Sequence, residues 1–125
     1  MSQRARGSYG MCRRYVEEFA EFEVKALLKL GLPVDNGAAD DREHLWFEPI
    51  SLGAEQITGT LLNDPWHIAG LKSGESYTYG IDVLSDWVIY TPVGTITPVE
   101  LAAARNLRAN RNEILEAMRA QDHST

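Results

Sequence analysis

The chain has 125 residues, 44% of them hydrophobic and 24% charged, with a mean hydropathy of -0.27 and a formal net charge of -6 at pH 7. This composition excludes a disordered chain, and the length fits one core, so we expect residues 1–125 to form a single domain. The acidic balance argues against general affinity for nucleic-acid phosphates or anionic lipid.

The first expected element is an amphipathic helix over about residues 10–30. Ser8 is placed to cap its start, and Gly31 followed by Pro33 is typical of a helix end. Residues 32–43 are rich in Asp, Gly and Pro without periodicity, which predicts a loop. Apolar side chains recur at three- to five-residue steps along the helix, as in a helix that docks on a core. They are Tyr15, Phe19, Phe22, Leu27 and Leu30.

Residues 43–91 change to short β-like segments, HLWFEPI, QITGTLL, SYTYGI and WVIYT, separated by short polar links. Several short strands so close together predict an antiparallel meander or a strongly bent sheet. Gly59 inside the second segment indicates a bulge or a close approach of backbone.

The first of these segments predicts two different sheet faces. Successive side chains of a strand point to opposite sides, so Leu45 and Phe47 share one face. His44, Trp46 and Glu48 share the other. We expect the apolar pair to face the helix-packed core and the mixed set to face the concave or edge side of the bent sheet.

The last expected element is a helix over about residues 98–120. Thr97 and Glu100 form an S/T-x-x-E capping box, and Pro98 takes the favoured first helical position. Three arginines recur at three-residue steps and form a basic stripe on this helix. They are Arg105, Arg108 and Arg111.

Together these elements predict an α+β fold. A bent four- to five-stranded antiparallel sheet over about residues 43–91 would pack with one N-terminal and one C-terminal α-helix.

Four short patterns, EHLW, GTLLNDP, GLKSGE and LSDW, follow one another in the β-rich part. This combination resembles the bacterial family DUF2314, in which an E-H-x-W strand, a G-x-L-x-N-x-P strand and turn, an L-K-x-G turn and an I-x-D-W segment occur in the same order. The resemblance covers residues 43 to about 90 and departs at both ends, where this chain has TPVGTI and a long helix. It implies a compact α+β domain and no established activity. The matching residues are Glu43, His44, Trp46, Gly59, Leu61, Asn63, Pro65, Leu71, Lys72, Gly74, Asp86 and Trp87.

Few residue patterns favour catalysis or metal binding. Ser85, His44 and Asp86 could supply a nucleophile, a base and an orienting acid, but no G-x-S-x-G turn precedes them. The histidines His44, His67 and His123 lack the spacing of metal ligands. We therefore predict no catalytic residues, no metal and no cofactor.

Simpler structural roles account for several of the same residues. Asp86 is expected to accept backbone hydrogen bonds at the start of the last strand, and Trp87 to fill core volume. Lys72 suits a solvated hairpin and Cys12 a small semi-buried position. A lone cysteine cannot form an internal disulfide, and no apolar run approaches the ~18 residues of a membrane span, so we expect a cytoplasmic protein without membrane contact.

The leading functional hypothesis is a small non-catalytic binding domain, such as an inhibitor, immunity-type or regulatory protein, that contacts another protein. Aromatic residues with polar tips that gather at one surface are typical both of interface centres and of ligand pockets. One alternative is therefore a small-molecule-binding protein or enzyme with a pocket around His44, Trp46, Asp86 and Trp87. The least favoured alternative is nucleic-acid binding through the arginine stripe. The expected binding residues are His44, Trp46, Asn63, Trp66, His67, Asp86 and Trp87.

Overall fold

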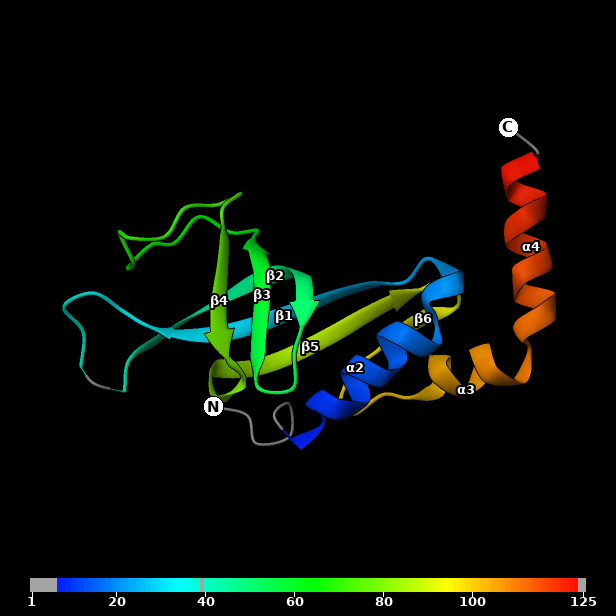
Figure 1. Cartoon of the computed structure of the whole chain (residues 1–125), viewed down its shortest axis with the longest axis horizontal. Helices are drawn as coiled ribbons and strands as arrows, with labels where there is room; N and C mark the ends of the chain where they lie inside the picture. Colours follow the sequence, from blue (N-terminus) through cyan, green and yellow to red (C-terminus); the bar gives the residue numbers. More distant parts are fainter. Residues whose placement is uncertain (1–6, 39, 124–125) are drawn as a thin grey trace.

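The computed structural model describes residues 7–38 and 40–123 and has the predicted α+β architecture (Figure 1). One open antiparallel sheet carries six strands in the order β4-β3-β2-β1-β5-β6. The strands are β1 (Lys25–Pro33), β2 (Arg42–Leu52), β3 (Gln56–Leu61), β4 (Ser76–Gly80), β5 (Leu84–Thr91) and β6 (Gly94–Ile96). The helices are α2 (Tyr9–Glu18), α3 (Ala102–Ala109) and α4 (Arg111–His123), with short 3₁₀ turns η1 (Ala20–Phe22) and η2 (Ile81–Val83).

The predicted helix over residues 10–30 is wrong in its second half, which forms β1 between β2 and β5. Helix α2 ends at Glu18, and Glu23 adopts a left-handed conformation with φ 56° after η1. From there the buried residues alternate with period two, which is the period of a strand. Leucines spaced this closely fit either period, so pairing with both neighbouring strands decides in favour of β1. The alternating buried residues are Ala26, Leu28, Leu30 and Leu32.

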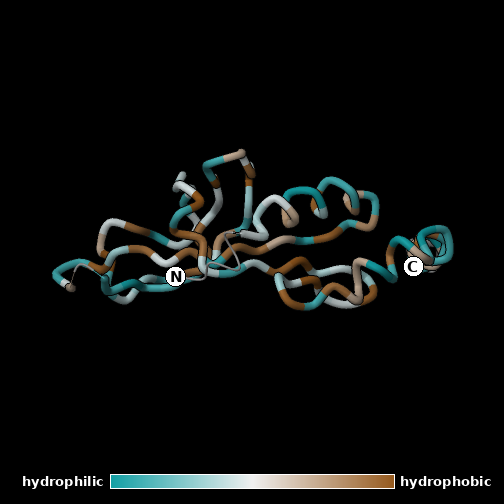
Figure 2. Tube along the Cα trace, turned by 90° about the horizontal axis from the view of Figure 1, so that it is seen from below, coloured by the Kyte–Doolittle hydropathy of each residue, from teal (hydrophilic) through white to brown (hydrophobic). Residues whose placement is uncertain are grey.

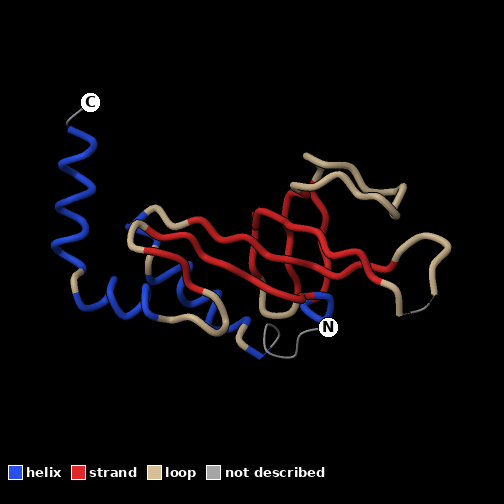
Figure 3. The backbone as a smooth tube through the Cα atoms, turned by 180° about the vertical axis from the view of Figure 1, so that it is seen from behind, coloured by secondary structure: helices blue, strands red, loops and turns tan. Residues whose placement is uncertain are grey.

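Strand β2 bends the sheet, as the sequence predicted. Its first part pairs with β1 as far as Phe47, and the part from Phe47 onward pairs with β3. The register with β3 shifts between Pro49 and Ser51, which is a bulge in the β2–β3 ladder. Strands β3 and β4 consequently cross β1 and β5 at a steep angle (Figures 1 and 3). Gly59 lies opposite Pro49, where a Cβ would come within 3.0 Å of the Glu48 carbonyl oxygen.

The hydrophobic core lies between one face of this sheet and α2. The predicted faces of β2 are confirmed in their burial: Leu45 and Phe47 are buried, whereas His44 and Glu48 are exposed. In Figure 2 the hydrophobic colour follows the strands, while α4 at one end of the molecule is mostly hydrophilic. Cys12 of α2 is fully buried, and this burial raises the pKa of its thiol to about 12.

The C-terminal helix begins later than the capping box predicted. Thr97 Oγ1 accepts a hydrogen bond from the Glu100 N–H at 3.1 Å, but the two residues also exchange backbone hydrogen bonds. Residues 97–100 therefore close a tight turn around Pro98. Glu100 then accepts a hydrogen bond from the N–H of Ala102, the first residue of α3, at 3.1 Å.

The predicted single helix over residues 98–120 is also broken in two. Asn110 separates α3 from α4 with φ -123° and ψ 31°, and its side-chain amide donates to Asn106 Oδ1 at 2.7 Å. Asparagine favours such breaks because its side chain competes for local hydrogen bonds. Helix α4 turns away from α3 and projects beyond the sheet (Figure 1). Within the described part of the chain, the length and apolarity needed to cross a bilayer are not reached by any helix.

Replacing Leu45 by aspartate should lower the free energy of unfolding by more than about 3 kcal/mol, because an unpaired charge would enter the core. Urea denaturation monitored by circular dichroism measures the change. Glu48→Ala on the opposite face is the matched control and should cost within about 1 kcal/mol, since it removes only the exposed 3.7 Å ion pair with Lys25. Equal midpoints for the two variants would contradict the face assignment.

Candidate functional site

The connection between β3 and β4, residues 62–75, is the longest irregular segment among the described residues, and we call it the β3–β4 loop. Loops longer than about 12 residues without secondary structure are uncommon in compact domains and are often functional. This loop lies beside the ends of β1 and β2 (Figures 1 and 3). Its backbone is attached to those strands at several points.

The first attachment continues the edge of β2. Leu62 donates its N–H to the Trp46 carbonyl oxygen at 2.9 Å, and the Trp46 N–H donates to Asn63 Oδ1 at 2.6 Å. The Asn63 side chain thus takes the place of a backbone carbonyl where β3 has ended. Asn63, a predicted binding residue, therefore holds the backbone of the β3–β4 loop against β2.

The second attachment is the Glu43 carboxylate. Glu43 Oε2 accepts a hydrogen bond from the Trp66 N–H at 2.8 Å, and Oε1 accepts one from the His67 N–H at 3.0 Å. Hydrogen bonds to an ionised acceptor are stronger than neutral ones. The side chain of Glu43 thereby fixes the backbone of the two residues that follow Pro65.

The third attachment comes from the loop between β1 and β2. Asp35 Oδ2 accepts a hydrogen bond from the Ala69 N–H at 2.7 Å, and the Asp35 N–H donates to the His67 carbonyl oxygen at 2.8 Å. Farther along, the Lys72 N–H donates to the Tyr77 hydroxyl at 2.9 Å. These hydrogen bonds hold the backbone of the β3–β4 loop at several points along its length.

The restrained loop presents a tryptophan to solvent. The Trp66 side chain is 88% exposed, the largest value among the exposed large hydrophobic residues of the described chain. Leu62 in the same loop is 41% exposed. An apolar side chain of this size is normally buried at least in part, because each exposed apolar Å² costs about 25 cal/mol relative to burial.

His67 lies next to Trp66 and lines a shallow hollow of about 400 Å³ at the ends of β1 and β2. The hollow carries both signs of charge, which suits a polar rim better than an enclosed ligand pocket. Its lining residues are Val34, Asp35, Asn36, Gly37, Asp41, Arg42 and His67.

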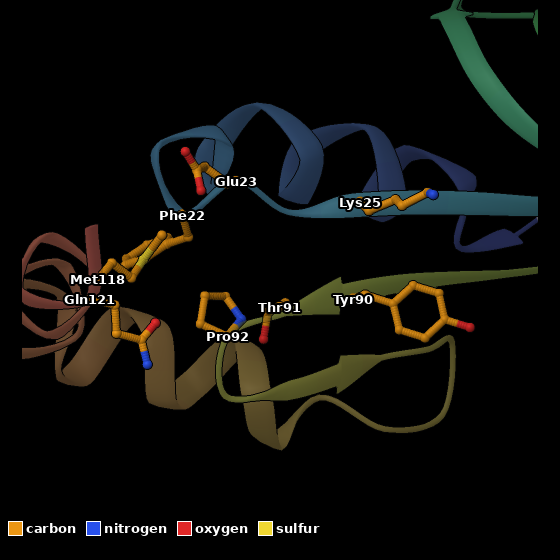
Figure 4. Close-up of a pocket in the computed structure, with 8 residues that line it drawn as sticks. All are labelled: Phe22, Glu23, Lys25, Tyr90, Thr91, Pro92, Met118 and Gln121. Atoms are coloured by element: carbon orange, nitrogen blue, oxygen red, sulfur yellow. The ribbon is translucent and has the colours of Figure 1, made fainter. Parts of the chain in front are cut away.

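A second hollow, of about 340 Å³, lies at the opposite end of the molecule between α4 and the turn from β5 to β6 (Figure 4). Met118 and Gln121 of α4 point toward Phe22 and Pro92 across it. The sequence-predicted binding residues do not line this hollow. The remaining lining residues are Glu23, Lys25, Tyr90 and Thr91.

Ser85, His44 and Asp86 are not linked as a nucleophile, a base and an orienting acid. His44 Nδ1 lies 3.0 Å from Ser85 Oγ, and the Ser85 hydroxyl donates to the Lys29 carbonyl oxygen at 3.0 Å. A carbonyl oxygen can only accept, so the Ser85 hydroxyl proton is used in the hydrogen bond to the Lys29 backbone carbonyl. The His44 Nδ1–H therefore donates to the Ser85 hydroxyl oxygen. Burial and the nearby Lys29 charge lower the pKa of His44, which favours this neutral imidazole. Asp86 Oδ1 accepts the Trp87 N–H at 2.8 Å, the role that the sequence predicted.

The predicted pocket around His44, Trp46, Asp86 and Trp87 is not formed, because Trp87 lies in the core with 1% of its surface exposed. A register shift between Lys29 and Leu30 opposite β5 places Trp87 on the buried face of the sheet. Its indole N–H donates to the Ser8 hydroxyl at 2.9 Å. On the other face, the half-buried Trp46 ring lies under the Lys29 ammonium at 5.5 Å.

The arginine stripe joins the C-terminal helices to the N-terminal one. Arg108 donates two hydrogen bonds to the Glu18 carboxylate, at 2.6 and 2.7 Å, and its guanidinium lies 5.4 Å from the centre of the Tyr15 ring. Arg111 pairs with Glu21. Two arginines of the stripe are therefore engaged within the chain, which weakens the nucleic-acid alternative. Glu18 and Glu21 share their three-residue spacing, a signal that sequence reasoning missed.

Metal ligands are not gathered in the described part of the chain, where no group of three or more His, Cys, Asp or Glu residues could hold an ion. The His44 imidazole contacts Ser85, His67 lines the hollow at the ends of β1 and β2, and the side chain of His123 lies outside the described residues. The structure thus brings Asn63, Trp66 and His67 together on one loop. His44, Trp46 and Asp86 lie on β2 and β5 instead.

The sequence matches the family described as "Uncharacterized protein conserved in bacteria (DUF2314)" over residues 3–116. This match is wider than the predicted resemblance over residues 43–90, so the expected departure at both ends is wrong. A protein of Neisseria meningitidis serogroup B named "Putative ankyrin repeat protein" is 30% identical over 63 residues, which are 50% of this chain and 25% of that protein. The chain therefore spans about a quarter of the length of this relative. No solved structure matches the chain.

Glu43→Ala should loosen the β3–β4 loop, because the Trp66 and His67 amides lose their acceptors. We expect faster amide hydrogen exchange at these two residues and a loss of about 1–3 kcal/mol in the free energy of unfolding. NMR-detected exchange measures the first and urea denaturation the second. Asp64→Asn, which alters an exposed carboxylate in the same loop, is the control. Unchanged exchange in the Glu43 variant would show that the carboxylate does not restrain the loop.

The pair of Glu18 and Arg108 should stabilise the fold in a pH-dependent way. The Arg108 hydrogen bonds lower the pKa of Glu18 below its usual value, so the contribution is present above that value and is lost as pH falls through the lowered pKa. A double-mutant cycle with Glu18→Gln and Arg108→Ala should give a coupling of about 0.5–1 kcal/mol at neutral pH, since the pair is partly exposed. Coupling that persists unchanged in strong acid would argue against this ion pair.

Proposed function

Because the chain belongs to the DUF2314 family of proteins conserved in bacteria, whose description names no reaction, we propose a role from the geometry of its surface. The protein is a small non-catalytic binding domain that contacts another protein through the β3–β4 loop, with Trp66 at the centre of the contact. One observation carries this proposal: the most exposed large hydrophobic side chain lies on a loop whose backbone is held by hydrogen bonds.

Energetic reasoning supports Trp66 as the anchor. Binding energy in protein interfaces concentrates in a few residues, and tryptophan is the most enriched type together with tyrosine and arginine. Ordering a flexible loop on binding costs free energy, and a loop that is already ordered avoids most of that cost. Asn63 restrains the backbone before Trp66, and Glu43 and Asp35 restrain it at and after Trp66, so the side chain extends from a backbone that is already ordered in the free protein.

The surroundings of Trp66 suit a protein partner. Leu62 adds exposed apolar surface on the same loop, and the hollow beside His67 carries Asp41 and Arg42 at its rim. An apolar centre inside a polar rim is the usual composition of a transient interface. His44 and Trp46, on the strand that holds the loop, would extend the surface along β2. The partner should offer an apolar pocket for an indole, bordered by charges of both signs.

An inhibitor, immunity-type or regulatory role belongs to this proposal, because each acts by binding alone. We also propose a cytoplasmic location, which the lone cysteine, Cys12, supports because it is buried as a thiol.

Trp66→Ala should abolish partner capture without changing stability. The side chain is 88% exposed, and the mutation keeps the backbone N–H that donates a hydrogen bond to Glu43. Immobilised wild-type and variant proteins would be exposed to lysate of a bacterium that carries the gene, and retained proteins quantified by mass spectrometry. Calorimetry with the purified partner should then show binding weakened by at least about 2 kcal/mol.

Val99→Ala is the matched control, because Val99 is 66% exposed in the turn before α3, away from the loop. It should retain the same partner with unchanged affinity. A partner that binds wild type and the Trp66 variant equally would move the binding site elsewhere, and a chain that retains nothing specific would contradict the proposed function.

A further inference from the structure

The two edges of the sheet are protected very differently. Strand β6 is only three residues long, and α3 packs against it. Strand β4 has the sequence SYTYG, without charge or proline, and among the described residues it pairs only with β3. Edge strands usually carry charge, proline or a bulge that prevents further pairing, and β4 lacks charge and proline, so its outer edge can accept another strand.

The hydrogen bonds on either side of β4 show which of its backbone groups face outward. Leu61 donates its N–H to the Glu75 carbonyl oxygen at 2.9 Å, and Ile81 donates to Glu55 at 3.0 Å. Bonded residues recur at every second position of an antiparallel ladder, so the odd-numbered residues of β4 bond to β3. The even-numbered residues Ser76 and Thr78 direct their N–H and C=O groups to the outer edge. Gly80 directs its N–H there, while its carbonyl accepts the first hydrogen bond of η2.

We propose that a second copy of this chain pairs with this edge, β4 against β4, around a two-fold axis at Thr78. Two identical antiparallel strands satisfy two-fold symmetry without further adjustment. In this register Thr78 lies opposite its counterpart and Ser76 lies opposite Gly80 of the other copy. The Thr78 pair can exchange both N–H···O hydrogen bonds, and the Gly80 N–H of each copy can donate to the Ser76 carbonyl oxygen of the other.

The aromatic side chains of β4 favour pairing with a second copy of this chain rather than with an unrelated strand. Tyr77 and Tyr79 are half-buried on the core side, and the Tyr79 ring lies edge-on to Phe47 with centroids 5.9 Å apart. The proposed register places Tyr77 of each copy opposite Tyr79 of the other. Cross-strand aromatic pairs stabilise sheets, and this pair would continue the aromatic row across the junction.

On the opposite face of β3 and β4, a row of hydroxyl side chains would also continue across the junction. Thr58 and Thr78 are joined through their hydroxyls at 2.8 Å, and Thr60 and Ser76 at 3.3 Å. The two Thr78 side chains would extend this row across the axis.

Charge is also compatible with pairing of identical strands. The nearest acidic residues, Glu75 and Asp82, would lie opposite Ile81 and Gly74 of the other copy, so like charges do not face each other. The net charge of -6 on each copy opposes association at long range, so added salt should strengthen the dimer.

Sedimentation velocity across a concentration series tests the proposal. Wild type should form a dimer as concentration rises, and Thr78→Lys or Thr78→Glu should each weaken dimerisation by at least about tenfold, because like charges would face each other at the axis. An equimolar mixture of the two variants should restore a dimer, now a heterodimer. Thr95→Lys places the same charge on the exposed part of β6 and should dimerise like wild type.

Amide hydrogen exchange of the wild-type protein gives a second test that needs no variant to fold. The amides of Thr78 and Gly80 should become protected as the dimer forms, whereas those of Tyr77 and Tyr79 should be protected at every concentration. A wild type that stays monomeric up to its solubility limit overturns the proposal and leaves the edge to a different protein. Dimers of Thr78→Lys as tight as wild type would overturn it as well.

Discussion

The bend in β2 is the constraint on which the rest of the structure depends. One strand pairs with β1 in its first part and with β3 in its second, and the register shift at Pro49 turns the chain between them. The turn lets Phe47 stay buried while β3 and β4 close over the core from another direction. It also ends β3 early, so part of the β2 edge remains unpaired beside Trp46. Residues of the β3–β4 loop form the hydrogen bonds that this edge would otherwise lack.

The candidate site follows from how this unpaired edge is satisfied. The Trp46 amide on this edge needs an acceptor, and the Asn63 side-chain oxygen takes the place of the carbonyl that a neighbouring strand would have supplied. The Glu43 carboxylate, on the same strand, accepts hydrogen bonds from the loop amides of Trp66 and His67 and so restrains the backbone that carries Trp66. Residues that matched the family patterns E-H-x-W and N-x-P thus bond to one another across the fold, and Glu43 also bonds to the backbone of Trp66, the residue after the second pattern.

Helices α2 and α3 are joined by charge and aromatic contact in place of a shared sheet. Arg108 lies over Tyr15 while it pairs with Glu18, so one guanidinium combines an ion pair with stacking on an aromatic face. This contact fixes α3 beside α2 and leaves α4 at the end of the molecule. The opposite end carries the open edge of β4, so the two proposed contact surfaces lie away from the C-terminal helices (Figure 1).

The periodicity of residues 43–91 was enough to predict a bent antiparallel sheet and the buried side of Leu45 and Phe47, because alternation is encoded within a few adjacent residues. It also drew attention to Trp66, but not to the hydrogen bonds that restrain its loop. Tertiary structure alone decided that Lys25–Pro33 is a strand, that Trp87 and Trp46 lie on opposite faces of the sheet and that the arginine stripe meets Glu18 and Glu21. Each of these outcomes depends on a strand register, a bulge or a charge partner supplied by a distant segment, and local sequence patterns carry no information about such pairings.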